Sequence, residues 1–349
     1  MPVVDLTAAE SLPNSAGPDR MKPVRIWLYV IAAMVLAMVV VGGLTRLTES
    51  GLSITEWKPV TGIIPPLSEA DWQVEFEKYQ QIPQYQVLNQ GMSLDDFQFI
   101  YFWEWFHRAL GRVIGLVFAV PFVVFLVQRR FNWDLALPLA GLFVLGGLQG
   151  VLGWWMVTSG LTELTSVSQY RLAAHLTAAL LLLMALVWVA RGLTPHRAPA
   201  NAEDRPAALI LMLLMVVQIA AGAFVAGLDA GMTYNTWPLM DGALVPDGLG
   251  VMEPWWRNLF ENALTVQFVH RTIAYVIVAY VAALWLWRRR AGGWLPRIAI
   301  LVLLQVVLGI GTLVMQVPLS LALGHQALAF MLAGAIVAWL ADMPRGANA

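Results

Sequence analysis

Long apolar runs separated by short polar connections dominate the chain from residue 26 onwards. Because an α-helix rises about 1.5 Å per residue, roughly 20 apolar residues are needed to cross about 30 Å of hydrocarbon. Eight runs reach this length: 26–45, 103–127, 136–157, 172–190, 207–227, 264–287, 298–316 and 321–341. The pattern predicts an all-α, polytopic membrane protein with eight transmembrane helices.

The polar connections fall into two sets that differ in charge. One set is basic and contains Arg20, Lys22, Arg25, Arg129, Arg130, Arg191, Arg197, Arg205, Arg288, Arg289, Arg290, Arg297 and Arg345. The other set consists of the two longest connections, 47–100 and 228–262, and is mainly acidic. Because basic connections stay on the cytoplasmic side of a membrane, we expect both termini in the cytoplasm and both long loops outside. The polar residues 1–25 predict a cytoplasmic tail, not a cleaved signal peptide.

The two halves of the chain repeat each other. A shift of 180 residues places Gly42 on Gly222 and Trp57 on Trp237, and smaller shifts superpose later positions. The later pairs are His107 with His270, Gln149 with Gln305, Gly153 with Gly309, and His175 with His325. Since four spans is an even number, both halves enter from the same side, which predicts two parallel four-helix-bundle repeats. The expected divisions are a tail at 1–25, a first half at 26–192 with an outer loop at 46–102, a linker at 193–206, a second half at 207–342 and a tail at 343–349.

Composition agrees with a membrane protein and narrows the chemistry. Hydrophobic residues make up 59% of the chain and charged residues 12%, about half the charged fraction of an average soluble domain. The net charge of −1 gives no indication of a nucleic-acid partner. The chain has no cysteine, which excludes disulfides, thiolate haem ligation and cysteine-based metal clusters within it.

Four of the five histidines lie within the predicted spans, two in each half: His107, His175, His270 and His325. Counted back from the basic ends, all four fall in roughly the outer third of the membrane. Two imidazoles at one depth on alternate helices of a bundle are what the two axial ligands of a haem require. The adjacent Arg108 and Arg271 are suited to bind the haem propionates.

Other interpretations of the polar residues in the spans remain open. A membrane histidine often makes only a hydrogen bond between helices. Zinc would require further Cys, His or carboxylate ligands close by. Gln149 and Gln305 can serve as packing hydrogen bonds or can line a haem pocket, and His196, in a basic connection, is expected to be solvated.

The halves differ next to their first histidines. Glu104 lies one turn before His107, whereas the matching residue of the second half is Gln267. Three arginines of the first half likewise have uncharged counterparts in the second: Arg46 is matched by Ala226, Arg112 by Tyr275 and Arg171 by Leu321. Because an ionisable carboxylate in a membrane is costly, we interpret Glu104 as functional. The alternative is that it only pairs with Arg108.

Three motifs resemble those of haem A synthases, which convert haem O to haem A for terminal oxidases. The first is Phe99 to Arg112 (FIYFWEWFHRALGR), the second is Gly42 to Ser53 followed by Glu56-Trp57-Lys58-Pro59, and the third is Asp229-Ala230-Gly231 before Asn235-Thr236-Trp237-Pro238. The resemblance covers about residues 25–342. It differs from many bacterial members in lacking a cysteine pair in the first outer loop, and is similar to the cysteine-free branch shared by mitochondria and related bacteria.

The resemblance implies roles for the residues already singled out. His107 and His175 would bracket the substrate haem, Glu104 would be the essential acid, and His270 with His325 would ligate haem b. The reaction would oxidise a ring methyl of haem O to a formyl group through two hydroxylations, with molecular oxygen and an external electron donor.

The expected partners follow from the same resemblance. They are haem O, haem O synthase (protohaem farnesyltransferase), oxidase assembly factors, an unidentified electron donor and membrane lipid, with a homo-oligomer also open. The expected location is the inner (plasma) membrane with the haem sites toward the outer face. The rival is a two-haem b-type cytochrome that only relays electrons; a transporter would instead cluster polar groups at the midplane.

Overall fold

The computed structural model describes residues 19–58, 61–162, 164–194, 201–288 and 293–343. Within these residues it is all-helical, and eight helices are long and apolar enough to cross a membrane. They are α1 (Lys22–Leu47), α4 (Leu94–Val127), α5 (Trp133–Thr162), α6 (Gln169–Gly192), α7 (Arg205–Gly227), α9 (Ala263–Trp287), α10 (Trp294–Val314) and α11 (Leu319–Asp342). The predicted all-α fold and the eight spans are confirmed. His196 and most of the predicted tails and linker lie outside the described residues.

Local sequence signals explain where several helices begin. Proline occupies the first turn of α1 and α7, where its missing N–H leaves no intrahelical hydrogen bond unmade. The Asn262 side chain caps α9 by accepting hydrogen bonds from the N–H groups of Leu264 and Thr265. Ser93 accepts from the N–H of Asp96 at 3.1 Å, so α4 begins nine residues before the predicted span.

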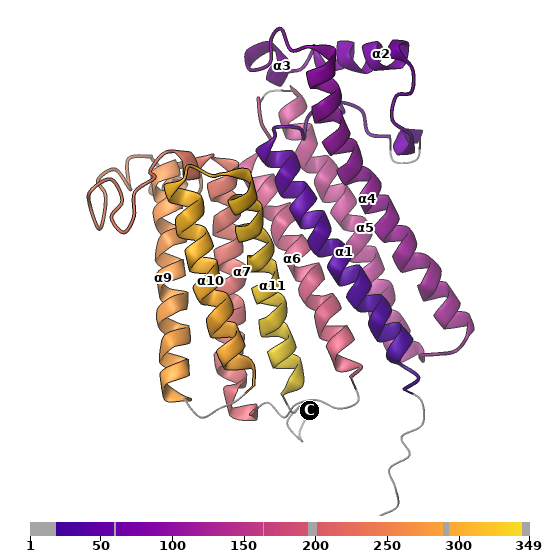
Figure 1. Cartoon of the computed structure of the whole chain (residues 1–349), viewed down its shortest axis with the longest axis vertical. Helices are drawn as coiled ribbons and strands as arrows, with labels where there is room; N and C mark the ends of the chain where they lie inside the picture. Colours follow the sequence, from indigo (N-terminus) through magenta and orange to yellow (C-terminus); the bar gives the residue numbers. More distant parts are fainter. Residues whose placement is uncertain (1–18, 59–60, 163, 195–200, 289–292, 344–349) are drawn as a thin grey trace, which may run out of the picture.

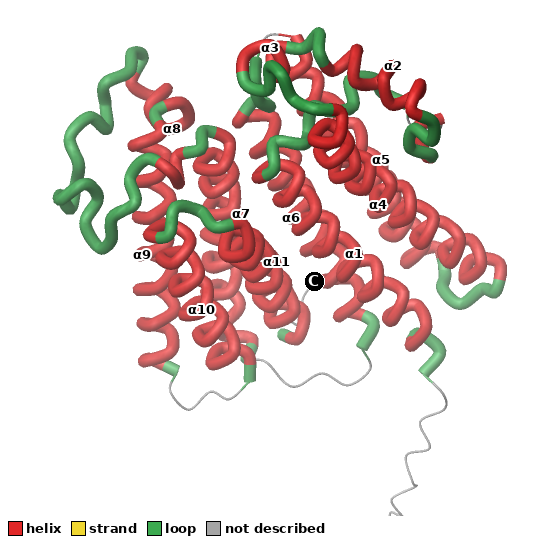
Figure 2. Tube along the Cα trace, turned by 45° about the horizontal axis from the view of Figure 1, so that its top comes forward, coloured by secondary structure: helices red, strands yellow, loops and turns green. Residues whose placement is uncertain are grey.

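The eight helices pack as two sets of four (Figures 1 and 2). Helices α1, α4, α5 and α6 contact one another in the first set, and α7, α9, α10 and α11 do so in the second. The sets join where α6 packs on α7 and α11, and where α1 packs on α11. The origin of both sets in one repeated unit stays a prediction.

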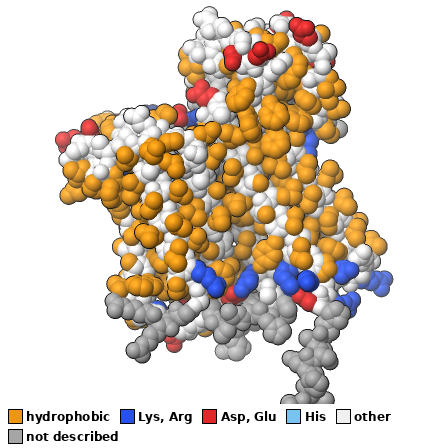
Figure 3. All heavy atoms as spheres, in the orientation of Figure 1, with side chains coloured by type: hydrophobic (Ala, Val, Ile, Leu, Met, Phe, Trp, Pro, Cys, Tyr) orange, Lys and Arg blue, Asp and Glu red, His pale blue; other side chains and the backbone are white. Residues whose placement is uncertain are grey.

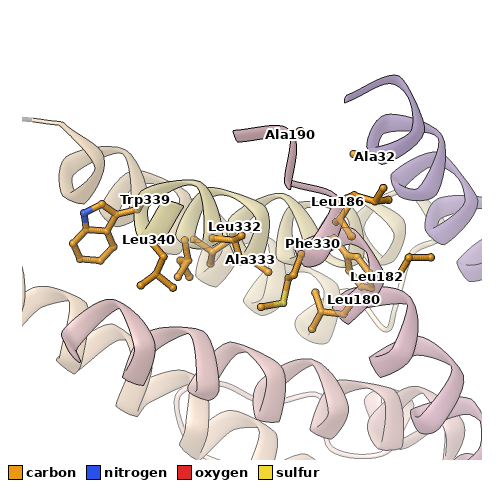
Figure 4. Close-up of a cluster of buried hydrophobic side chains, with 14 of the residues drawn as sticks. Ala32, Leu180, Leu182, Leu186, Ala190, Phe330, Leu332, Ala333, Trp339 and Leu340 are labelled. Atoms are coloured by element: carbon orange, nitrogen blue, oxygen red, sulfur yellow. The ribbon is translucent and has the colours of Figure 1, made fainter. Parts of the chain in front are cut away.

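The main hydrophobic core lies where the two sets meet (Figure 4). Leu180 and Leu186 of α6 and Phe330 and Leu332 of α11 are almost fully buried there. The outward faces of the helices are apolar and exposed, as expected for surfaces that contact lipid (Figure 3).

A smaller folded unit covers one end of the first set. It contains η1 (Thr61–Ile63), α2 (Glu69–Tyr79) and α3 (Pro83–Val87), and we call residues 48–93 the cap. Its own core joins Phe76 and Tyr79 of α2 to Phe97 and Tyr101 in the first turns of α4. The end of the molecule that carries the cap and the 228–262 loop is called the long-loop end below. The 228–262 loop contains η3 (Ala230–Met232), η4 (Trp255–Arg257) and α8 (Asn258–Glu261).

Polar contacts tie the two sets together at both ends. At the long-loop end Arg46 of α1 donates to both carboxylate oxygens of Asp229 at 2.8 Å. At the opposite end, Arg191 of α6 makes two 2.7 Å hydrogen bonds to Asp342 of α11. Asp342 is fully buried and also accepts from the Trp294 indole of α10 at 2.8 Å.

Candidate functional site

The structure brings the rings of His270 of α9 and His325 of α11 close together. Their ring centroids are 6.5 Å apart, with the planes at 77°. When two imidazoles bind one metal ion on opposite sides, two bonds of about 2 Å each and the two ring radii separate the ring centroids by roughly 6 Å. One metal ion between the rings therefore matches this spacing.

Each of the four predicted ligands packs against a glycine of a neighbouring helix. A methyl group added at Gly42 would lie 3.3 Å from His107, and one at Gly153 would lie 3.4 Å from His175. In the second set the distances are 3.0 Å from Gly222 to His270 and 2.8 Å from Gly309 to His325. The repeat pairs Gly42 with Gly222 and Gly153 with Gly309, but the sequence did not show that these glycines contact the histidine rings. Their recurrence in both halves was the available signal.

Glutamine side chains hold three of the four imidazoles. Gln305 donates to His325 Nδ1 at 3.2 Å and to the His325 carbonyl at 3.0 Å. With its amide nitrogen facing His175, Gln149 makes the matching contacts at 3.3 and 3.2 Å. Both glutamines thus orient candidate ligands, which favours the pocket-lining interpretation over simple packing.

Gln218 is a further residue that the sequence did not single out. Its amide lies 3.4 Å from His270 Nε2. It stands one turn before Gly222, whereas Met38 stands one turn before Gly42 in the first set. The second histidine pair therefore has an additional polar neighbour that the first lacks.

Glu104 is buried, with 3% of its surface exposed, and both of its carboxylate oxygens have partners. One carboxylate oxygen accepts hydrogen bonds from the Ser53 hydroxyl and the Ile54 N–H, both at 2.8 Å. The other accepts from Arg108 at 2.6 Å. The alternative ion pair with Arg108 is therefore present, and the functional role of Glu104 one turn before His107 stays a prediction.

The two arginines predicted to bind propionates donate to carbonyl groups at equivalent positions of the two long loops and differ in that, among the described residues, only Arg108 also pairs with a carboxylate. Arg108 donates to Glu104 and to the carbonyl oxygens of Ile54 and Glu56, both at 3.1 Å. Arg271 donates through one nitrogen to the carbonyl oxygens of Tyr234 and Thr236.

Unpartnered donors gather at the second histidine pair. Nε and Nη1 of Arg271 are buried without a partner in the described part of the chain, and so is Nδ1 of His270. Buried donors of this kind need an acceptor, and a carboxylate would supply one. The second pair and Arg271 therefore fit a haem with its propionates.

The described residues contain no group of three or more His, Asp or Glu side chains able to hold a metal ion. A zinc site of that kind is absent from them, because zinc prefers four ligands, usually three or four from protein. The histidines instead form pairs, and two protein side chains are the number that can ligate a haem iron.

Comparison with known proteins decides the family. Residues 25–337 match the model of the cytochrome oxidase assembly protein family. The chain is 60% identical over 312 residues to a protein named heme A synthase from Azorhizobium caulinodans, covering 87% of this chain and 89% of that protein. It is 54% identical over 320 residues to the heme A synthase of Mesorhizobium japonicum, covering 89% and 88%. The chain belongs to the haem A synthase family.

Membership of the haem A synthase family confirms the resemblance drawn from the three motifs. The structure also shows how one motif is held in place in this member. Asn235 donates to the carbonyl oxygens of Gly231 at 2.6 Å and of Leu313 at 2.8 Å, which fixes the second long loop to α10. The motif residues thus shape the loop whose carbonyl groups contact Arg271.

Proposed function

We propose that this chain is a haem A synthase that oxidises one ring methyl of haem O to a formyl group. The observation that carries the proposal is the pairing of four histidines with four glycines, two pairs in each set of helices. The identity of 60% to a protein named heme A synthase gives independent support. Each hydroxylation consumes one O₂, two electrons and two protons and releases water; after the second, loss of water leaves the aldehyde.

The first set of helices is the proposed reaction site. His107 and His175 hold the iron of haem O, and the haem itself supplies the oxidation chemistry when O₂ and electrons are available. Gly42 and Gly153 keep the two imidazoles seated, and Gln149 orients His175. Glu104 is the proposed essential carboxylate: it moves a proton at the alcohol stage or stabilises a developing positive charge.

The second set is the proposed site of a permanent haem b. His270 and His325 would hold its iron, and Gln305 would fix the orientation of the second ring. Arg271 would pair with the propionates through its unpartnered nitrogens. Arg108 is the corresponding residue of the first site, where its main contribution is to hold the wall formed by residues 54–56.

We place the enzyme in the inner membrane with both termini in the cytoplasm and the haem sites toward the outer face. Lys and Arg side chains gather at the end opposite the cap, which supports this orientation (Figure 3). Haem O synthase, oxidase assembly factors and an external electron donor are the proposed partners.

Haem extraction from purified protein tests the function. We expect haem b together with haem O or haem A. Recovery of haem b alone, at two per chain, would favour the rival cytochrome that relays electrons without modifying haem.

Three histidine variants test the assignment of the two sites. His107→Ala or His175→Ala should abolish haem A formation and leave one haem b per chain. His270→Ala should lower the haem b content. Loss of haem b in His107→Ala with continued haem A formation would show that the two sites are assigned in the wrong order.

A further inference from the structure

Two apolar segments at the long-loop end are exposed on opposite sides of the molecule (Figure 1). The first is Thr61 to Leu67, which contains no ionisable side chain; Ile64 is 66% and Leu67 80% exposed. The second is the loop 244–256, in which Leu244 is 81% and Val251 74% exposed, and which also carries the exposed carboxylates of Asp247 and Glu253. Exposed apolar surface of this kind marks a place of contact with another phase or molecule.

The height of the first segment can be read along α4. About 20 residues counted back from Val127 at the basic end reach Arg108, so the hydrocarbon begins near Arg108. The Trp105 indole donates to the Ile63 carbonyl at 3.1 Å, and Arg112 donates to the Lys58 carbonyl at 3.0 Å. Trp105 stands about 5 Å outside this boundary and Arg112 about 6 Å inside it. Lys58 and Ile63 therefore lie beside α4 at the edge of the hydrocarbon.

The second segment lies at a similar height along α9. About 20 residues counted back from Trp287 reach Phe268. Thr265 donates to the Leu249 carbonyl at 2.7 Å, and Asn262 donates to the Gly248 carbonyl at 3.0 Å. These contacts hold the loop about 5 to 9 Å outside the hydrocarbon boundary.

We propose that Thr61–Leu67 and the loop 244–256 are membrane-surface anchors, inserted into the lipid headgroup layer at the long-loop end. This layer is about 5 to 8 Å thick, so the carbonyl groups of Ile63 and Leu249 lie within it and that of Gly248 lies at its outer edge. Trp255 and Trp256 lie in the second segment, and tryptophan is enriched in this layer. Lipid is the favoured occupant over a second copy of the chain, because two different segments on opposite sides share one height.

Because the chain contains no cysteine, a single introduced cysteine gives one unique labelling site. Ile64→Cys, Leu67→Cys, Leu244→Cys and Val251→Cys would each carry a nitroxide in nanodiscs of phosphatidylcholine and phosphatidylglycerol. Val74→Cys is the matched control, since Val74 is an exposed apolar residue of α2 in the same cap. Collision of each nitroxide with O₂ and with a water-soluble nickel chelate is then measured by electron paramagnetic resonance.

We expect the four labels to collide several-fold less with the nickel chelate than the Val74 label does, while their collision with O₂ is maintained or increased. Collision with nickel equal to that at Val74 would place the segments in water and overturn the proposal. Low collision with both reagents would mean that protein covers the segments, as in a dimer, and would overturn it as well. Neither result bears on haem chemistry, so the proposed function is tested separately.

Discussion

At the scale of single residues, the most informative feature is the seat that glycine gives to each histidine. A ring that must reach an iron needs room on its far side as well as a fixed direction. Gly309 gives that room to His325, while Gln305 on the same helix fixes the direction. The four glycines are therefore part of the binding sites although they bear no chemistry.

Gly309→Ala should displace His325, because the new methyl group would lie 2.8 Å from the ring. Overpacking costs about 1–3 kcal/mol, so the affinity for haem b should fall by roughly tenfold or more. The haem b absorbance per chain measures this. Gly311→Ala, whose methyl group would meet only Leu321 at 3.6 Å, is the control and should retain full haem. Equal haem content in both variants would contradict the role of the glycine seat.

Glu104→Gln separates chemistry from structure at the first site. An amide offers one acceptor oxygen where the carboxylate has two, and its NH₂ group would face donors from Ile54 and Ser53 or Arg108. We expect haem A production to fall by about tenfold or more, with haem b retained.

Ser53→Ala is the matched variant, because it removes one cap contact and leaves the carboxylate in place. If Glu104 acts in the chemistry, the ratio of haem A to haem b should stay near that of the unmodified protein in Ser53→Ala. An equal fall of the ratio in both variants would reduce Glu104 to a residue that fastens the cap.

At the scale of elements, the cap is held by a network of charges above the membrane. Lys78 donates to Glu56 at 2.8 Å and to Glu75 at 2.9 Å, joining α2 to the residues that follow α1. Hydrogen bonds from Lys58 and Lys78 lower the pKa of Glu56 to about 2. Hydrogen bonds to Glu56 and Glu75 raise the pKa of Lys78.

The cap should therefore loosen in acid. Since the folded state lowers the pKa of Glu56 from 4.5 to about 2, its contribution is complete above pH 4.5 and is lost as the pH falls toward 2. The rate of proteolysis within residues 48–93, measured with an acid-stable protease, should rise over this interval. Glu56→Gln should show a smaller rise, because it cannot titrate. The same rise in both would assign the effect to other carboxylates.

The sequence predicted the transmembrane elements well and the cap poorly. Runs such as 207–227 and 264–287 are specified by hydropathy alone, because the bilayer imposes one length on every span. The local caps Ser93 and Ser68 mark where α4 and α2 begin, but hydropathy does not reveal these starts because both lie in a polar connection. How α2 and α4 pack through Phe76, Phe97 and Tyr101 depends on contacts between residues distant in the sequence.

At the scale of the whole molecule, buried charge joins the two sets of helices. The pair between Arg191 and Asp342 connects α6 to α11 at the basic end, and it lies beside the core shared by both sets. Removal of one member would leave the other with no counter-charge in a poorly solvated place.

Asp342→Ala should lower the stability of the protein by about 3 kcal/mol, because it strands Arg191. The apparent melting temperature in detergent, followed by haem release or intrinsic fluorescence, measures the loss. Glu203→Gln is the control: it weakens an exposed pair with Arg288 and should cost less than about 1 kcal/mol. A similar small shift in both variants would show that the buried pair does not hold the sets together.

The proposed orientation predicts that a reporter fused after Ala349 is active in the cytoplasm. Activity only outside would reverse the orientation and place the haem sites on the opposite face. A reporter inserted after Glu77, an exposed residue of the cap, should behave in the opposite way.

The positions of the candidate histidines were predictable from the sequence, and the side chains that contact them were less so. The depth and pairing of the histidines follow from counting along helices, because one turn has a fixed rise. Which glutamine reaches which ring, and that Glu104 faces Ser53 and Ile54, depend on how helices rotate against one another. Gln218 was missed because its counterpart is Met38, so the repeat gave it no emphasis.

One turn of α1 serves both sites at once. Gly42 seats His107, while the adjacent Gly43 lies against Gln326, the residue after His325, and Gln326 donates to the Val39 carbonyl at 3.1 Å. A shift of this turn would move a wall of each site together. If both sites hold haem as proposed, occupancy of one would be linked energetically to affinity at the other, and such linkage is reciprocal. The arrival of haem O and its departure as haem A would each be registered at the resident haem as a change in its midpoint potential.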